Sequence, residues 1–84
     1  MQKYSENIPK VVLILNELDR NKQLSELYRL GIISTKIKMW HQVYLMVAAE
    51  MKIGNTKSVA VTRVADITEI HERTIYKILN RLNS

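Results

Sequence analysis

Residues that break regular structure are scarce in this chain: its 84 residues include one proline and two glycines. β-Sandwiches and barrels need many tight turns, which Gly and Pro usually supply. Hydrophobic residues make up 46% of the sequence, a proportion typical of a folded globule. We therefore expect an all-α fold, in which Pro9, Gly31 and Gly54 separate helical segments.

Chain length and the absence of cysteine limit the classes of protein further. At this size folding buries roughly 60–65% of the unfolded chain's surface, which is enough for one domain with a modest core. Without cysteine there are no disulfides, thiolate metal sites or thiol catalysis, as is common in a reducing compartment. The longest apolar run, residues 11–15, is far shorter than the roughly 20 residues that cross a bilayer. We expect a cytoplasmic protein with no membrane partner and no signal peptide.

Two helices are predicted before Gly31. Pro9 suits the first helical position because it lacks the N–H that would be unpaired there, so a helix should run from residue 9 to about residue 21. The run VVLIL in this segment also fits a strand. The apolar stripe of this helix would comprise Val11, Ile14, Leu15 and Leu18. A shorter helix carries Leu24, Leu27, Tyr28 and Leu30. It should end at Gly31, where a left-handed cap lets Ile32 fold back.

A third, longer helix is predicted between residues 34 and 54. Ser34 or Thr35 can cap its start, and Gly54 with Asn55 can end it because both tolerate positive φ. Its apolar residues recur at alternating steps of three and four, as on one face of a helix: Ile37, Trp40, Tyr44, Val47 and Met51.

The last third of the chain, SVAVTRVADITEIHERTIYKILNRL, reads as two short helices that meet at an angle. Ser58 is a candidate cap for the first of them, and Val61, Val64 and Ala65 form its apolar face. After a break, a second apolar series comprises Ile70, Ile75, Ile78, Leu79 and Leu82. Polar residues occupy the other side of this helix: Glu72, Arg73, Tyr76, Lys77, Asn80 and Arg81.

This segment resembles the helix-turn-helix superfamily of DNA-binding proteins over about 25 residues. VADITEIHERTIYKIL carries the resemblance, and HERTIYKIL is similar to the recognition helices of many bacterial regulators. The small residue midway along the family's first helix corresponds to Ala65, and its three spaced apolar positions correspond to Ile70, Ile75 and Ile78. These separations of five, five and three carry most of the likeness.

Two positions depart from the family pattern. The turn usually holds a left-handed Gly, whereas here the order is Ile67, Thr68, Glu69, and a non-Gly residue costs about 1 kcal/mol or more in that conformation. Ser, Thr or Asn usually caps the recognition helix, whereas here His71 can accept through a neutral ring nitrogen. We expect no wing, because Asn83 and Ser84 alone follow Leu82.

The resemblance implies which side chains read DNA. Arg73 can form two hydrogen bonds to guanine, Lys77 can reach guanine or phosphate, Asn80 can pair with adenine, and Glu72 can accept from cytosine. Tyr76 can contact a thymine methyl group or a phosphate. Residues at the start of the preceding helix would lie against the DNA backbone: Lys57, Ser58, Thr62 and Arg63.

Charge placement is compatible with this assignment. The net charge is +5, and residues 34–84 hold +4 of it, with eight basic and four acidic residues. This places the surface that would face a polyanion in the second part of the chain. Arg73, Lys77 and Arg81 step by four, however, as on any solvated helix face, and Tyr76 can equally shield the edge of the core. Only their place after the tight turn favours contact with DNA.

The sequence offers no sign of catalysis or of a bound metal. His41 and His71 lack the spacing of a metal site, and no Gly-rich elbow or phosphate loop accompanies any Ser, His and Asp set. Trp40 and the methionines at positions 39, 46 and 51 are typical of packing. We expect a protein that is not an enzyme and needs no cofactor and no metal.

We expect residues 1–84 to form a single domain, in which residues 1–33 are a helical appendage and residues 34–84 a tri-helical core. The appendage offers more apolar surface than one protomer hides, which predicts a homodimer through Val12, Leu13, Leu24, Leu27 and Tyr28. The implied function is sequence-specific binding of double-stranded DNA by a small transcriptional regulator or mobile-element accessory factor, associated with the nucleoid. The alternative is a protein-interaction module that docks on a polymerase or replication protein.

Overall fold

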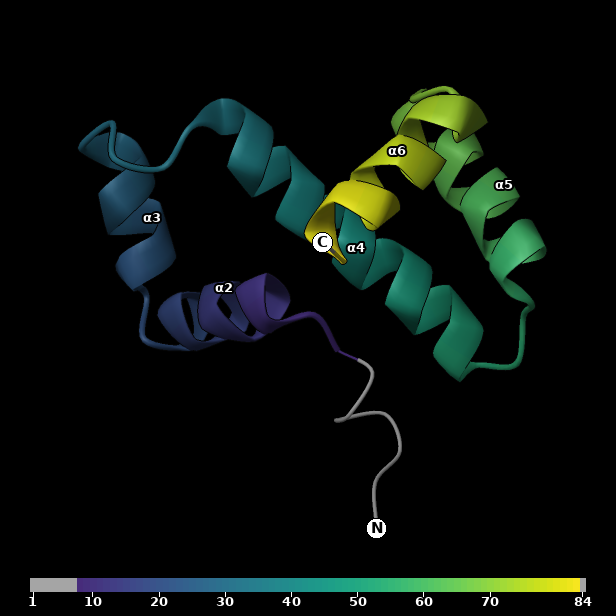
Figure 1. Ribbon diagram of the computed structural model, residues 1–84, viewed down its shortest axis with the longest axis horizontal. Coiled ribbons are helices and arrows are strands. Elements are labelled where there is room, and N and C mark those ends of the chain that lie inside the picture. Colours follow the sequence, from purple (N-terminus) through teal and green to yellow (C-terminus); the bar gives the residue numbers. More distant parts are fainter. Residues whose placement is uncertain (1–7, 84) are drawn as a thin grey trace, which may run out of the picture.

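The computed structural model describes residues 8–83, and over that range the chain forms five α-helices and no strand (Figure 1). The helices are α2 (Lys10–Arg20), α3 (Gln23–Arg29), α4 (Thr35–Lys52), α5 (Lys57–Thr68) and α6 (Glu72–Leu82). The predicted all-α class is confirmed, and the run VVLIL lies inside α2. The ends of the predicted domain, residues 1–7 and 84, lie outside the described residues. None of these five helices combines the length and the hydropathy of a bilayer-spanning segment.

Glycines end two of the helices as the sequence predicts. Gly31 has φ 83 and follows α3; its N–H donates to the Tyr28 carbonyl at 3.0 Å, and the Ile32 N–H donates to the Leu27 carbonyl at 2.9 Å. This pair of bonds is a Schellman motif, which satisfies the last carbonyls of the helix. An equivalent pair of bonds closes α4 at Gly54, where φ is 112.

The helix starts agree with the sequence prediction at α4 and differ at α5. Ser34 Oγ caps α4 by accepting from the Ile37 N–H at 3.2 Å. At α5, Thr56 takes the cap in place of Ser58, and its Oγ1 accepts from the Val59 N–H at 3.3 Å. Both residues are good capping types, but the chain is already extended at Thr56 after the turn, so the helix begins at Lys57 and Ser58 lies inside its first turn.

The buried face of α2 differs from the predicted stripe. Val12 is 0% exposed and Leu15 is also buried, whereas Val11 and Ile14 are exposed. A run of five apolar residues presents several possible faces, and packing against the other helices selects the face that carries Val12. Pro9 precedes α2 as its cap residue and is not its first helical residue.

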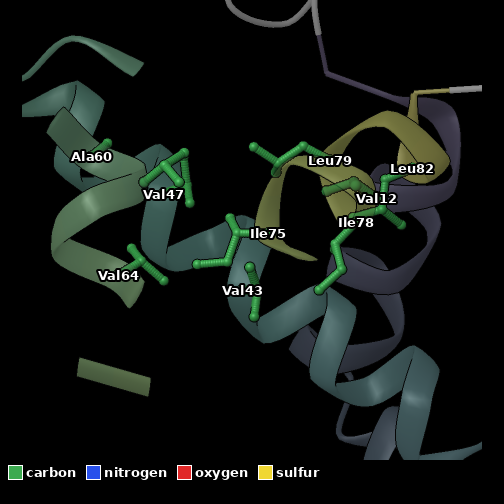
Figure 2. Packing of buried hydrophobic residues seen from close by; sticks show 10 residues of the cluster. Val12, Val43, Val47, Ala60, Val64, Ile75, Ile78, Leu79 and Leu82 are labelled. Atoms are coloured by element: carbon green, nitrogen blue, oxygen red, sulfur yellow. The ribbon is translucent and has the colours of Figure 1, made fainter. Parts of the chain in front are cut away.

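The core lies where α4, α5 and α6 meet, because each of these helices contacts the other two. Figure 2 shows Ile75, which is 0% exposed, among Val43, Val47 and Val64 of the neighbouring helices. The core face of α4 is therefore built on Val43 and Val47. Met51, the last residue of the predicted stripe of α4, is exposed. The buried cluster comprises Val12, Val43, Val47, Ala60, Val61, Val64, Ile75, Ile78, Leu79 and Leu82.

The helices α2 and α3 lie on the side of α4 opposite to α5 (Figure 1). They contact each other, and α2 joins the core through Val12 and through a hydrogen bond of 2.7 Å between Asn16 Oδ1 and His41 Nε2 of α4. His41 is 3% exposed. This burial lowers the pKa of His41, and the charge of Asp19 acts in the opposite direction. A buried apolar residue and a part-buried hydrogen bond thus hold α2 against the rest of the molecule.

Candidate nucleic-acid interface

The connection between α5 and α6, residues 69–71, is a tight turn held by specific hydrogen bonds. Glu69 adopts the left-handed conformation with φ 64, and its N–H donates to the Ala65 carbonyl at 2.8 Å. The Thr68 hydroxyl donates to the Val64 carbonyl at 2.7 Å and accepts from the Ile70 N–H at 3.2 Å. A glutamate therefore occupies the conformation for which glycine is the usual residue.

His71 caps α6, as the sequence predicts. Its Nδ1 accepts from the backbone N–H of Arg73 at 3.1 Å, so the hydrogen of the neutral ring lies on Nε2. After this cap, Ile75 and Ile78 are buried in the core, and Ile70 packs against it from the turn. The predicted apolar series of this helix is confirmed.

The polar side of α6 faces away from this core. The residues predicted to contact DNA from this helix are all exposed: Glu72, Arg73, Tyr76, Lys77 and Asn80. Arg81 is exposed on the same side of the helix. Within residues 8–83, the ion pairs join Arg20 to Glu17, Arg29 to Glu26 and Arg63 to Glu50. The three cations of α6 take part in none of these pairs, so they are available to an anionic partner.

Lys57 brings the first turn of α5 to the polar side of α6. Its ammonium lies 6.0 Å from the centroid of the Tyr76 ring, at the outer limit of a cation–π contact. These two predicted contact residues, which are far apart in sequence, therefore lie side by side.

The other predicted contacts on α5 differ in whether their side chains are engaged elsewhere in the protein. Ser58 and Thr62 are exposed one turn apart, and the Thr62 hydroxyl donates to the Ser58 carbonyl at 3.1 Å. Arg63 is engaged elsewhere, because its Nε lies 2.8 Å from Glu50 Oε1, an oxygen that also accepts from the Asn55 amide at 2.7 Å. The structure thus ties Arg63 to the end of α4 and does not bring it to the α6 residues.

One exposed residue of α6 was missed by sequence reasoning. Thr74 lies in the first turn beside Arg73, and its hydroxyl is a donor of the kind that phosphates accept. Its position in the first turn of α6, next to Arg73, is the signal that could have identified it.

Searches among models of protein families, curated proteins and solved structures found no match for this chain. Over residues 8–83, no three His, Asp or Glu side chains gather as they would around a metal ion. The arrangement of α5, the turn and α6 is therefore the basis for inferring function.

Proposed function

We propose that this chain binds double-stranded DNA in a sequence-specific manner, with α5 and α6 as a helix-turn-helix and α6 as the recognition helix. The observation that carries the proposal is the outer face of α6: Arg73, Lys77 and Arg81 are exposed, free of ion pairs in the described chain, and opposite a buried apolar face. In cellular terms the protein would be a small transcriptional regulator or a mobile-element accessory factor in the cytoplasm, associated with the nucleoid.

The dimensions and chemistry of α6 suit the major groove. A helix with its side chains is about 10–12 Å across, and the major groove is about 12 Å wide. Arg73 at the start of the helix would bind guanine through two hydrogen bonds, and Asn80 would pair with adenine. Glu72, Tyr76 and Lys77 would complete the contacts to bases or neighbouring phosphates.

Lys57 is the best-placed contact to the DNA backbone, because it lies beside Tyr76 at the edge of the polar face of α6. Ser58 and Thr62 follow it on α5 and would donate to phosphates once the Thr62 hydroxyl turns away from the Ser58 carbonyl. Arg63 would have to exchange Glu50 for a phosphate, so its contribution would be smaller than that of Lys57.

We further propose that the chain forms a homodimer through its first two helices. Val12 and Leu24, two of the residues predicted for this interface, are buried inside the protomer and are not part of it. The surface left is formed by exposed apolar residues of α2, of α3 and of the segment that follows α3: Leu13, Ile14, Tyr28, Leu30 and Ile32. A dimer that binds a palindrome would place two recognition helices roughly 34–36 Å apart.

Paired substitutions test the DNA proposal. Arg73→Ala should cost about 1–3 kcal/mol on the preferred site and much less on random DNA, because a bidentate guanine contact is lost. Lys57→Ala should weaken binding to every sequence alike and make the slope of log affinity against log salt shallower by about one unit. Arg20→Ala, which removes the same charge from α2, is the matched control and should leave both quantities nearly unchanged.

The preferred site comes from selection of bound sequences out of a random DNA pool, and circular dichroism checks that the variants fold equally. Equal losses for Arg73→Ala and Lys57→Ala on all DNA would make Arg73 a phosphate contact and refute direct readout by it. If neither substitution matters, the protein-interaction module that docks on a polymerase or replication protein becomes the better account. The exposed Ile53, Val59 and Ile67 would then be the residues to test.

A further inference from the structure

A groove of about 640 Å³ runs along the C-terminal half of α4, between α2 and the end of α6. Tyr44, Ala48 and Met51 line it from α4, at the spacing of one helical face, and Leu79 lines it from α6. Small-molecule sites are concave, mostly apolar and about 300–1,000 Å³ in volume. The groove therefore has the size and the apolar surface of a ligand site.

The polar residues of the groove are cationic or neutral. Lys52 ends α4 and Lys57 begins α5, so the two lysines flank the connection between these helices, and no Asp or Glu among residues 8–83 lines the groove. Asn16 and Asn83 add amide groups on the other elements. Burial raises the pKa of Tyr44, which keeps its hydroxyl protonated and able to donate. This charge pattern complements an anion with an apolar body.

We propose that this groove binds a small amphipathic anion, a carboxylate carried on an aliphatic or aromatic body, and that this ligand lowers the affinity of the protein for DNA. The apolar body would lie against Tyr44, Ala48 and Met51, and the carboxylate would pair with Lys52 and Lys57.

Lys57 is the physical link between the groove and the DNA face. It lines the groove, and its ammonium also lies 6.0 Å from the ring of Tyr76 on α6. A carboxylate in the groove attracts this ammonium away from the phosphate that it would otherwise contact. This step rests on the proposed function. Because coupling between two binding sites is reciprocal, DNA weakens ligand binding by the same factor.

Binding in the groove is tested without DNA. Octanoate is titrated into the full chain and followed by NMR chemical shifts, with 1-octanol as the uncharged probe. We expect octanoate to bind about fivefold more tightly than 1-octanol, because only octanoate forms charge-assisted hydrogen bonds with the lysines. Equal binding of the two probes would overturn the assignment of an anion.

Two neighbouring alanines supply the matched variants. Ala48 and Ala49 are both exposed on α4, but only Ala48 lines the groove. Ala48→Trp should abolish octanoate binding and Ala49→Trp should preserve it, while both keep the helical circular dichroism of the parent. If both variants bind octanoate like the parent, the ligand lies elsewhere. If Ala48→Trp alone changes the sedimentation behaviour, the groove is an interface between copies of the chain, and the ligand proposal is wrong.

The link to DNA is measured separately, by DNA titrations with and without saturating octanoate. We expect a loss of affinity of about fivefold or more and a salt slope shallower by about one unit, as for one phosphate contact removed. In Lys57→Met, octanoate should change neither the DNA affinity nor the salt slope. If octanoate binds and DNA affinity is unchanged, the coupling is refuted. If the chain binds no DNA at all, the proposed function fails, while the groove is still judged by the octanoate titrations alone.

Discussion

Replacing Glu69 by glycine should stabilise the protein, because Glu69 adopts φ 64 in the turn before α6. A left-handed conformation costs a residue with a Cβ roughly 1–2 kcal/mol, and glycine adopts it without that cost. Glycine also increases the entropy of the unfolded chain, which offsets about 0.5–1 kcal/mol of the gain. The net increase in the free energy of unfolding should be about 0.5–1 kcal/mol.

Thermal and urea unfolding measure this difference. In a domain of this size 1 kcal/mol corresponds to about 4–8 °C in Tm, so Glu69→Gly should raise Tm by about 2–8 °C. Glu69→Ala is the matched control, because it removes the same carboxylate and retains the Cβ. Glu69 takes part in none of the ion pairs of the described chain, so neither variant breaks a charge contact. An equal Tm for the two variants would show that the turn stores no backbone strain and would refute the reasoning.

Three further predictions concern packing, helix ends and pH. Ala65→Leu should cost about 1–3 kcal/mol of unfolding free energy and weaken DNA binding, because it overpacks the partly buried contact between α5 and the core; unchanged melting and binding would mean that Ala65 does not pack there. Gly31→Ala should lower the free energy of unfolding by about 0.5–1 kcal/mol: backbone strain at φ +83 costs roughly 1–2 kcal/mol, nothing lies within 4 Å of the added Cβ, and the lower entropy of the unfolded chain offsets about 0.5–1 kcal/mol. Denaturant unfolding tests this. Because burial lowers the pKa of His41, this side chain is protonated below about pH 6.5 in the unfolded chain but is still neutral there in the folded chain. The free energy of unfolding should therefore be highest above pH 6.5 and decrease as pH falls from there toward the lowered pKa, and His41→Gln should remove this part of the pH dependence.

The C-terminal ends of α3 and α4, and the last helix, were predictable from sequence because their signals are local. A glycine at the end of an apolar periodic segment, as at Gly31 and Gly54, adopts the left-handed conformation without strain, and in that conformation the N–H groups that follow satisfy the last carbonyls of the helix. The strict separation of apolar and polar residues in residues 72–82 allows only one buried face. The cap by His71 followed from its position directly before that segment.

Features that depend on contacts between helices were not predictable in the same way. Several faces of the apolar run at residues 11–15 are equally hydrophobic, so its buried face is decided by what α2 meets, and Val12 replaces Val11 in the core. Thr56 and Ser58 both cap helices, and the preceding turn chooses between them. The pairing of Arg63 with Glu50 and the contact of Lys57 with Tyr76 join residues from different helices, and no spacing rule within one helix reveals them.

The hydrogen bond between Asn16 and His41 has a consequence for how this sequence can diverge. Replacing Asn16 alone by leucine leaves a buried imidazole without its partner, which costs about 1–3 kcal/mol, whereas an apolar pair of similar shape at both positions can be nearly neutral. A lineage that loses one member of the pair is therefore under selection to lose or replace the other. We expect positions 16 and 41 to covary among descendants of this chain. Each descendant should have either polar residues at both positions or apolar residues at both.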